Sequence, residues 1–161
     1  MKPEHLRRIV NETTAIIGLY NPNATELLML TAAQESHLGE YLYQIKGPAL
    51  GIFQMEPATH ESLWKNYLVR KPELVKKLTA FITTREHANL MLAGNIPYQA
   101  AMGRIFYYEK PGELPDGQDV VGMAKSWKKY WNTVHGKGTV EEAINNYNRY
   151  VKGLKNVTTS R

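Results

Sequence analysis

The chain of 161 residues has no cysteine. This excludes disulfide bonds and cysteine-ligated metal sites, and it leaves the redox compartment open. The sequence also has no apolar run close to the roughly 18–20 residues that span a membrane, so no membrane insertion is expected. The basic N-terminus is followed by the polar residues 11–14 instead of an apolar core, so we expect no signal peptide and synthesis in the cytoplasm.

Several signatures of catalysis and binding are missing as well. There is no Gly-x-Ser-x-Gly motif and no phosphate-binding P-loop. The five histidines form no i, i+4 pair, so neither a metal nor another cofactor is expected. The net charge is +5, but the basic residues are spread along the chain, so nucleic acid is not an expected partner. A mild positive excess does favour anionic polymers, of which peptidoglycan is one.

What is present predicts a globular, mainly α domain with little or no β-structure. Hydrophobic residues make up 43% of the chain and charged residues 22%, and the length suits one domain over residues 1–155 with a polar tail over 156–161. Apolar residues recur at helical spacing in several segments. The predicted helices cover 3–20, 24–36, 57–69, a segment from 72, 83–94, 97–109, 119–132 and a segment from 139 through 147.

Local signals set the expected helix starts. Capping boxes, in which a polar side chain is followed three residues later by Glu, predict three of them. They are Asn23 with Glu26, Thr83 with Glu86, and Thr139 with Glu142. Prolines at positions 3, 57 and 97 suit the first helical turn. Residues 41–45 alternate enough to predict a short strand or an extended flap.

Glu35 is the principal candidate catalytic residue. It shares one helical face with Leu28 and Ala32, at the end of a strongly apolar helix. Burial and the negative end of the helix dipole both disfavour the carboxylate and raise its pKa. A carboxyl group that keeps its proton near neutral pH can act as a general acid on a glycosidic oxygen. The alternative is an ordinary residue of the last helical turn that points into water.

Three further polar or small residues follow this glutamate. The hydroxyl of Ser36 is expected to bond either the backbone or the substrate. Gly51 opens a loop and permits a close approach of the backbone to a sugar. Gln54, in the same loop, offers a donor and an acceptor that match an N-acetyl group or a hydroxyl.

The motifs Glu35-Ser36, Gly51-Ile52-Phe53-Gln54-Met55 and Pro57-Ala58-Thr59 resemble those of soluble lytic transglycosylases and goose-type lysozymes. Glu35 and Gln54 are 19 positions apart, close to the spacing in that family. A third family motif maps onto residues 146–150, where Tyr147 and Asn148 are kept and the small neighbouring residues are not. The resemblance covers residues 24–60 well and 140–151 loosely.

The resemblance implies a lysozyme-like fold and the cleavage of peptidoglycan glycan strands. Glu35 would act first as acid on the MurNAc–GlcNAc bond and then as base on the MurNAc C6 hydroxyl, forming 1,6-anhydro-MurNAc. Five residues would bind the substrate. They are Ser36, Gly51, Gln54, Tyr147 and Asn148. Tyrosines 41, 43, 107 and 108 can stack on sugar rings, although most aromatic residues serve packing.

Two alternatives stay open. One is a muramidase (hydrolase) on the same fold, distinguished by reducing instead of anhydro product ends. Two-carboxylate glycosidases need a second carboxylate about 5–9.5 Å from the acid, and Glu40 and Glu56, the nearest in sequence, are expected to face solvent. The other alternative is a virion structural or glycan-binding protein without turnover. The small size and the loop around residues 108–116 favour a phage-encoded member. Such a protein would be carried in the virion among other virion proteins and open the host cell wall locally, or it would be an endolysin.

Overall fold

The computed structural model describes residues 1–84, 87–133 and 135–154. Within these ranges the chain forms eight α-helices and only isolated β-bridges, which confirms the prediction of a mainly α chain. The α-helices are α1 (Pro3–Ile16), α2 (Pro22–Ser36), α3 (Pro57–Ser62), α4 (Pro72–Leu78), α5 (Ala88–Gly94), α6 (Ile96–Tyr108), α7 (Val120–Ser126) and α8 (Val140–Asn146). The predicted tail 156–161 and the Glu86 of one predicted capping box lie outside the described residues.

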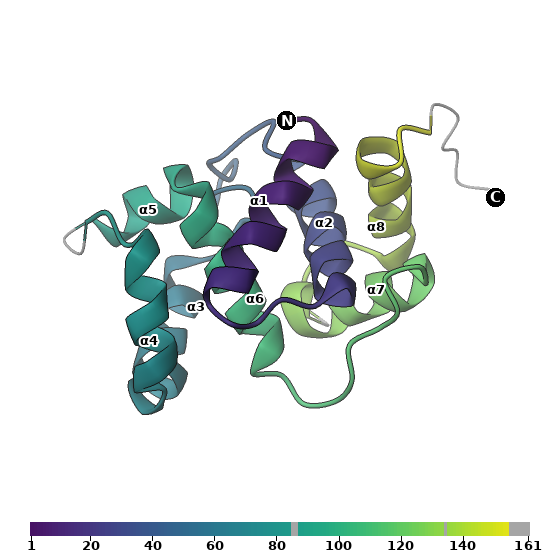
Figure 1. Ribbon diagram of the computed structural model, residues 1–161. Coiled ribbons are helices and arrows are strands. Elements are labelled where there is room, and N and C mark those ends of the chain that lie inside the picture. Colours follow the sequence, from purple (N-terminus) through teal and green to yellow (C-terminus); the bar gives the residue numbers. More distant parts are fainter. Residues whose placement is uncertain (85–86, 134, 155–161) are drawn as a thin grey trace.

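The core is built around α2 and α6. Every residue from Leu27 to Ala33 on α2 is buried, and so is every residue from Tyr98 to Tyr107 on α6. Helices that are apolar on all sides need neighbours on all sides. Accordingly, α1, α6, α7 and α8 contact α2, and α5 packs on α6. Figure 1 shows α3, α4 and α5 to one side of α1 and α6, with α7 and α8 to the other side.

The start of α2 differs from the prediction. The N-cap is Asn21 and not Asn23, because the side chain of Asn21 accepts hydrogen bonds from the backbone N–H groups of Asn23 and Ala24. Pro22 then occupies the first helical position, where its missing N–H has no cost. Glu26 is not part of a capping box; it contacts Arg7 instead.

The predicted helix 3–20 ends early, at Ile16. Gly18 adopts a φ of +77°, a left-handed conformation that glycine reaches without strain. The N–H groups of Gly18 and Leu19 then bond the carbonyls of Ala15 and Thr14, which closes the helix with a Schellman motif. Ile16, the last residue of the helix, is 54% exposed.

Short π-helical and 3-10 segments extend several helices. The π-helical segments are η1 (Leu63–Tyr67), η4 (Trp127–Asn132) and η5 (Tyr147–Val151), and the 3-10 segments are η2 (Leu68–Arg70) and η3 (Thr79–Phe81). With these extensions, the predicted helices 57–69 and 119–132 agree with the structure to within one or two residues. The predicted cap at Thr139 is confirmed, since its hydroxyl accepts the N–H of Glu142 at 3.1 Å.

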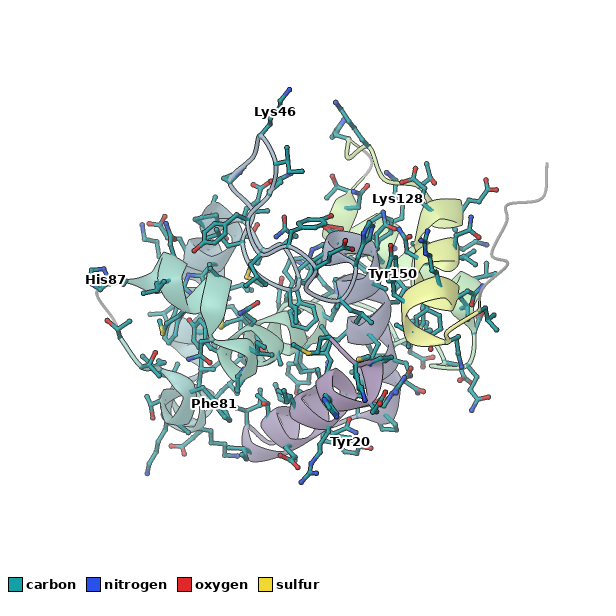
Figure 2. All side chains as sticks on the ribbon, turned by 90° about the horizontal axis from the view of Figure 1, so that it is seen from above. Tyr20, Lys46, Phe81, His87, Lys128 and Tyr150 are labelled. Carbon is teal, nitrogen blue, oxygen red and sulfur yellow. The ribbon has the colours of Figure 1, made fainter. Side chains whose placement is uncertain are left out.

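The loop between α2 and α3 contains no regular strand. Tyr43 and Leu50 form one isolated antiparallel bridge, and Leu50 and Met55 form a second. The predicted strand or flap over 41–45 is therefore an extended loop, and Figure 2 shows Lys46 at its tip, projecting from the body of the molecule. None of the described helices has the length and apolar composition needed to cross a bilayer.

Candidate active site

The C-terminal end of α2 borders an open cavity of about 810 Å³. The loop 49–56 forms one wall, and residues 131–133 and 136–138 form another. Most of the residues that line the cavity are polar, as expected for a site that receives a hydroxylated ligand. Of the six predicted site residues, Glu35 and Gln54 line this cavity.

The carboxyl group of Glu35 is held in a partly buried position. Burial raises the pKa of Glu35 to about 7, while a hydrogen bond from the Trp127 indole N–H opposes this rise. The indole Nε1 donates to Oε2 across 3.2 Å. Near neutral pH the group is therefore poised between its acid and its base form, which suits a residue that must first give and then take a proton.

The sequence did not single out Trp127 for this role. It is fully buried where α7 passes into η4, 92 positions from its acceptor. A tryptophan in an amphipathic helix is ordinarily read as core packing. Only the packing of α7 against α2 brings the indole to Glu35.

Ser36 does not line the cavity. Its side chain is fully buried, and its hydroxyl donates to the Ile52 carbonyl at 2.6 Å and accepts the N–H of Gly39 at 2.8 Å. Of the two roles expected for this hydroxyl, the structure contains the backbone contact. Ser36 thus ties the end of α2 to the loop that carries Gln54.

Gly51 is required by packing within the protein. Its φ is +81°, and a Cβ atom there would lie 2.0 Å from the Leu92 carbonyl oxygen and 2.1 Å from Gln99 Oε1. The close approach is therefore to α5 and α6, and Gly51 is not among the residues that line the cavity. Gln99, which the sequence did not reveal, accepts the N–H of Ile52 at 2.6 Å and so anchors the loop on α6.

Gln54 is oriented by the same loop. Its φ is +51°, a conformation uncommon outside glycine, and its side chain is almost fully buried. Nε2 donates to the Gly51 carbonyl at 2.9 Å. The amide is thereby fixed at the cavity wall, and its oxygen is the atom left to accept a hydrogen bond from a ligand.

The third motif is placed differently from the expectation. Tyr147 is fully buried, and its hydroxyl donates to Glu26 at 2.8 Å. Glu26 lies near the start of α2, whereas Glu35 lies near its end. Asn148 is half-buried, and neither residue lines the cavity. Asn146 is the residue of this motif that approaches the site, since its Nδ2 donates to Gln34 Oε1 at 2.7 Å.

Aromatic side chains reach the cavity from α6 and η4. Phe106 and Trp131 line it with ring centroids 4.5 Å apart. Tyr107 was a candidate for stacking on sugars, but it is buried and its hydroxyl bonds Thr31 at 2.8 Å. The other three candidate tyrosines lie outside the lining as well; Tyr43 and Tyr108 are exposed at 62% and 51%, and Tyr41 packs edge-on against His37.

Further carboxylates lie near Glu35 in the fold. Glu40 is exposed and lies 3.3 Å from the His37 ring, which agrees with its predicted solvent-facing position. Glu56 is exposed too, but it lines the cavity together with Glu142. Among the residues that the structure describes, no three His, Cys, Asp or Glu side chains are grouped as metal ligands.

The chemically distinctive residues at this cavity are Glu35, Trp127 and Gln54, which come from α2, the start of η4 and the loop between α2 and α3. Comparisons of the chain with protein-family models, with curated proteins and with solved structures gave no match.

Proposed function

We propose that this protein is a peptidoglycan lytic transglycosylase that cleaves the β-1,4 bond between MurNAc and GlcNAc. The observation that carries the proposal is the Glu35 carboxyl group, whose pKa is raised to about 7 by burial at the wall of a large polar cavity. The motifs around Glu35 and Gln54, at the spacing of the lytic transglycosylases, point to the same chemistry.

The reaction needs one group that acts in both directions. Protonated Glu35 gives its proton to the glycosidic oxygen as the bond to MurNAc C1 breaks. The carboxylate then takes the proton of the MurNAc C6 hydroxyl while O6 bonds to C1, which yields the 1,6-anhydro ring and restores the acid. No water is consumed, and a group with a pKa near 7 serves both steps at neutral pH.

The cavity offers contacts for the rest of the glycan. The Gln54 amide oxygen can accept from an N-acetyl N–H or a hydroxyl group. Phe106 and Trp131 present aromatic surface for the apolar face of a sugar ring. We infer that the protein acts in the cell wall of a phage host, with virion proteins as its further partners, on the strength of the sequence resemblance alone.

A muramidase is the second candidate, and a specific observation favours it. Glu56 and Glu142 line the same cavity as Glu35. A hydrolase of this type uses a second carboxylate about 5–9.5 Å from the acid as nucleophile or base. If either residue serves in this way, the cleaved MurNAc ends take up water and are reducing.

Product analysis separates the two reactions. Purified wild type, Glu35→Gln, Glu56→Gln and Glu142→Gln are incubated with peptidoglycan sacculi, and the released muropeptides are identified by mass spectrometry. We expect anhydro-MurNAc ends from the wild type and from the Glu56 and Glu142 variants, and at least about 100-fold less product from Glu35→Gln. Glu40→Gln, which changes an exposed carboxyl group outside the cavity, is the matched control.

Other outcomes have defined meanings. Reducing ends, one water heavier, together with a loss of activity in Glu56→Gln or Glu142→Gln, would establish the muramidase. No product from a folded wild type would contradict both enzymes and favour a structural or glycan-binding role.

A further inference from the structure

The C-terminal half of α6 buries an arginine. Arg104 is only 5% exposed. Its Nε donates to the Leu19 carbonyl at 2.8 Å, and its guanidinium carbon lies 5.2 Å from the centre of the Tyr108 ring. These contacts orient the guanidinium group, but neither supplies a negative charge.

The charge of this arginine has no counter-ion among the described residues. No carboxylate of these residues forms an ion pair with Arg104. Its Nη1 atom is buried without a hydrogen-bond partner. An uncompensated buried charge is strongly destabilising, so proteins rarely retain one without a use. Burial also lowers the pKa of Arg104, which reflects the same cost.

Arg104 lines a second cavity, of about 320 Å³. The loop that leads from α6 to α7, seen as a long connection in Figure 1, covers it with residues 110–114. No residue that lines this cavity also lines the one at Glu35. Asn21, Ser126 and Leu114 are among the other residues that line this cavity.

We propose that this cavity binds a small organic oxyanion, a carboxylate or a phosphate ester, through the Arg104 guanidinium group. Guanidinium groups bind both anions through paired N–H donors. The volume is at the lower end of the range of small-molecule sites, about 300–1,000 Å³, so an anion with a short apolar portion fits. The half-buried Leu114 supplies a contact for such a portion.

Two neighbouring charges bear on the binding. Lys110 also lines the cavity, but its Nζ is 2.6 Å from Glu109, so its charge is already paired. Glu113 is exposed on the covering loop and lines the cavity too, but it forms no ion pair with Arg104, so it is the carboxylate to test as an internal counter-ion.

The side-chain Nε–H resonance of Arg104 tests the proposal in the intact wild-type protein. Inorganic phosphate and acetate are titrated at constant ionic strength against chloride, and the ¹H–¹⁵N shift is followed. We expect a saturable shift, with half-saturation on the order of millimolar for a bare ion, with phosphate or acetate and not with chloride. The ion that saturates at the lower concentration identifies the class of ligand.

Variants provide the controls. A bound anion should raise the Tm of the wild type, and Arg104→Gln should lose this increase. Arg149→Gln should keep it, because Arg149 also stacks on a tyrosine but is exposed and lies outside the cavity. Should Arg104→Gln fail to fold, the titration of the wild type still decides the question. A chemical shift that changes linearly with the concentration of every ion would overturn the proposal. So would a shift of the Arg104 Nε–H resonance in anion-free Glu113→Gln, because it would show that Glu113 already forms an ion pair with Arg104. Binding needs no turnover, so these results are independent of the proposed glycan cleavage.

Discussion

Glu35 is expected to make the folded protein less stable as the pH rises. Its pKa is raised from the ordinary value of 4.5 to about 7 in the folded state. The folded state therefore holds the proton more tightly than the unfolded state, and stability falls as the pH rises from about 4.5 to about 7. The expected loss is on the order of 2–3 kcal/mol. Burial of this carboxyl group thus lowers the stability of the folded protein at neutral pH, and the same burial raises the pKa that the proposed catalysis uses.

Denaturant unfolding of wild type and Glu35→Gln at pH 4 and pH 8 measures this effect. The glutamine cannot ionise, so the variant should be the more stable protein at pH 8 and close to the wild type at pH 4. The same difference at both values would contradict a raised pKa.

Replacing Trp127 by phenylalanine should move the pH dependence of activity. The variant loses the N–H that donates to Glu35 at 3.2 Å, and this bond lowers the pKa of the carboxyl group. The alkaline limb of the kcat/KM profile should therefore shift to higher pH, because the acid form persists longer. Trp131→Phe is the matched control, because it changes the cavity lining without removing this hydrogen bond. It should change KM and leave the pH of the alkaline limb where it is in the wild type.

The sequence identified the acid and the amide of the candidate site but not their supports. Glu35 and Gln54 could be predicted because their motifs have a fixed spacing and lie near each other in the chain. Tyr147 and Asn148 were predicted from a motif whose small residues are missing, and the tyrosine points into the core. Trp127 could not be predicted, since its role arises from helix packing across 92 positions.

The segment that closes the cavity after η4 is held by one ammonium group. Lys128 Nζ donates to Asn132 Oδ1 at 2.6 Å, to the Gly136 carbonyl at 2.9 Å and to the Gly138 carbonyl at 2.7 Å. All three of its N–H donors are thus used on Asn132, Gly136 and Gly138. A Cβ atom on Gly138 would lie 2.6 Å from the Trp127 ring, so this segment also packs against the indole that bonds Glu35.

Lys128→Met should therefore lower activity without unfolding the protein. The methionine keeps the length of the side chain but leaves two backbone carbonyls unbonded, so residues 136–138 should lose protection from hydrogen exchange. We expect KM to rise several-fold, since the glycan would bind to a cavity with one loosened wall. Lys129→Met removes an exposed ammonium one position away and should leave both KM and exchange unchanged. Unchanged exchange in Lys128→Met would refute the proposed clamp.

Helices were predicted better than their ends. The apolar runs located α2 and α6, because helices that are buried on all sides are apolar along most of their length. The choice of Asn21 over Asn23 as N-cap depended on Pro22, which fits the first helical turn so well that the helix starts there. The π-helical turns have no such signal, because they result from tertiary packing at the ends of α3, α7 and α8.

One half-buried carboxylate, that of Glu26, joins both ends of the described chain to the central helix. Glu26 on α2 accepts from Arg7 Nε on α1 at 2.8 Å and from the Tyr147 hydroxyl on η5 at 2.8 Å. Burial disfavours the Glu26 anion, but these hydrogen bonds and the charges of Arg7 and Lys152 outweigh it, so its pKa is lowered. The third motif thus serves assembly of the fold here, because it links the last described helix to α2.

Glu26→Gln should accordingly destabilise the protein at neutral pH and much less in acid. A lowered pKa means that the stabilisation is present above the unfolded value of 4.5 and is lost as the pH falls through the folded value. The pair is partly exposed, with 34% and 21% of the two side chains accessible, so the expected cost at pH 7 is only about 1 kcal/mol. Unfolding curves of the wild type and the variant should converge as the pH falls below 4, whereas Glu12→Gln, which breaks an exposed pair with Arg8, should change little at any pH. A cost that stayed constant down to pH 2 would mean that Glu26 contributes through its shape and not its charge, and the link between the termini and α2 would then be a packing contact.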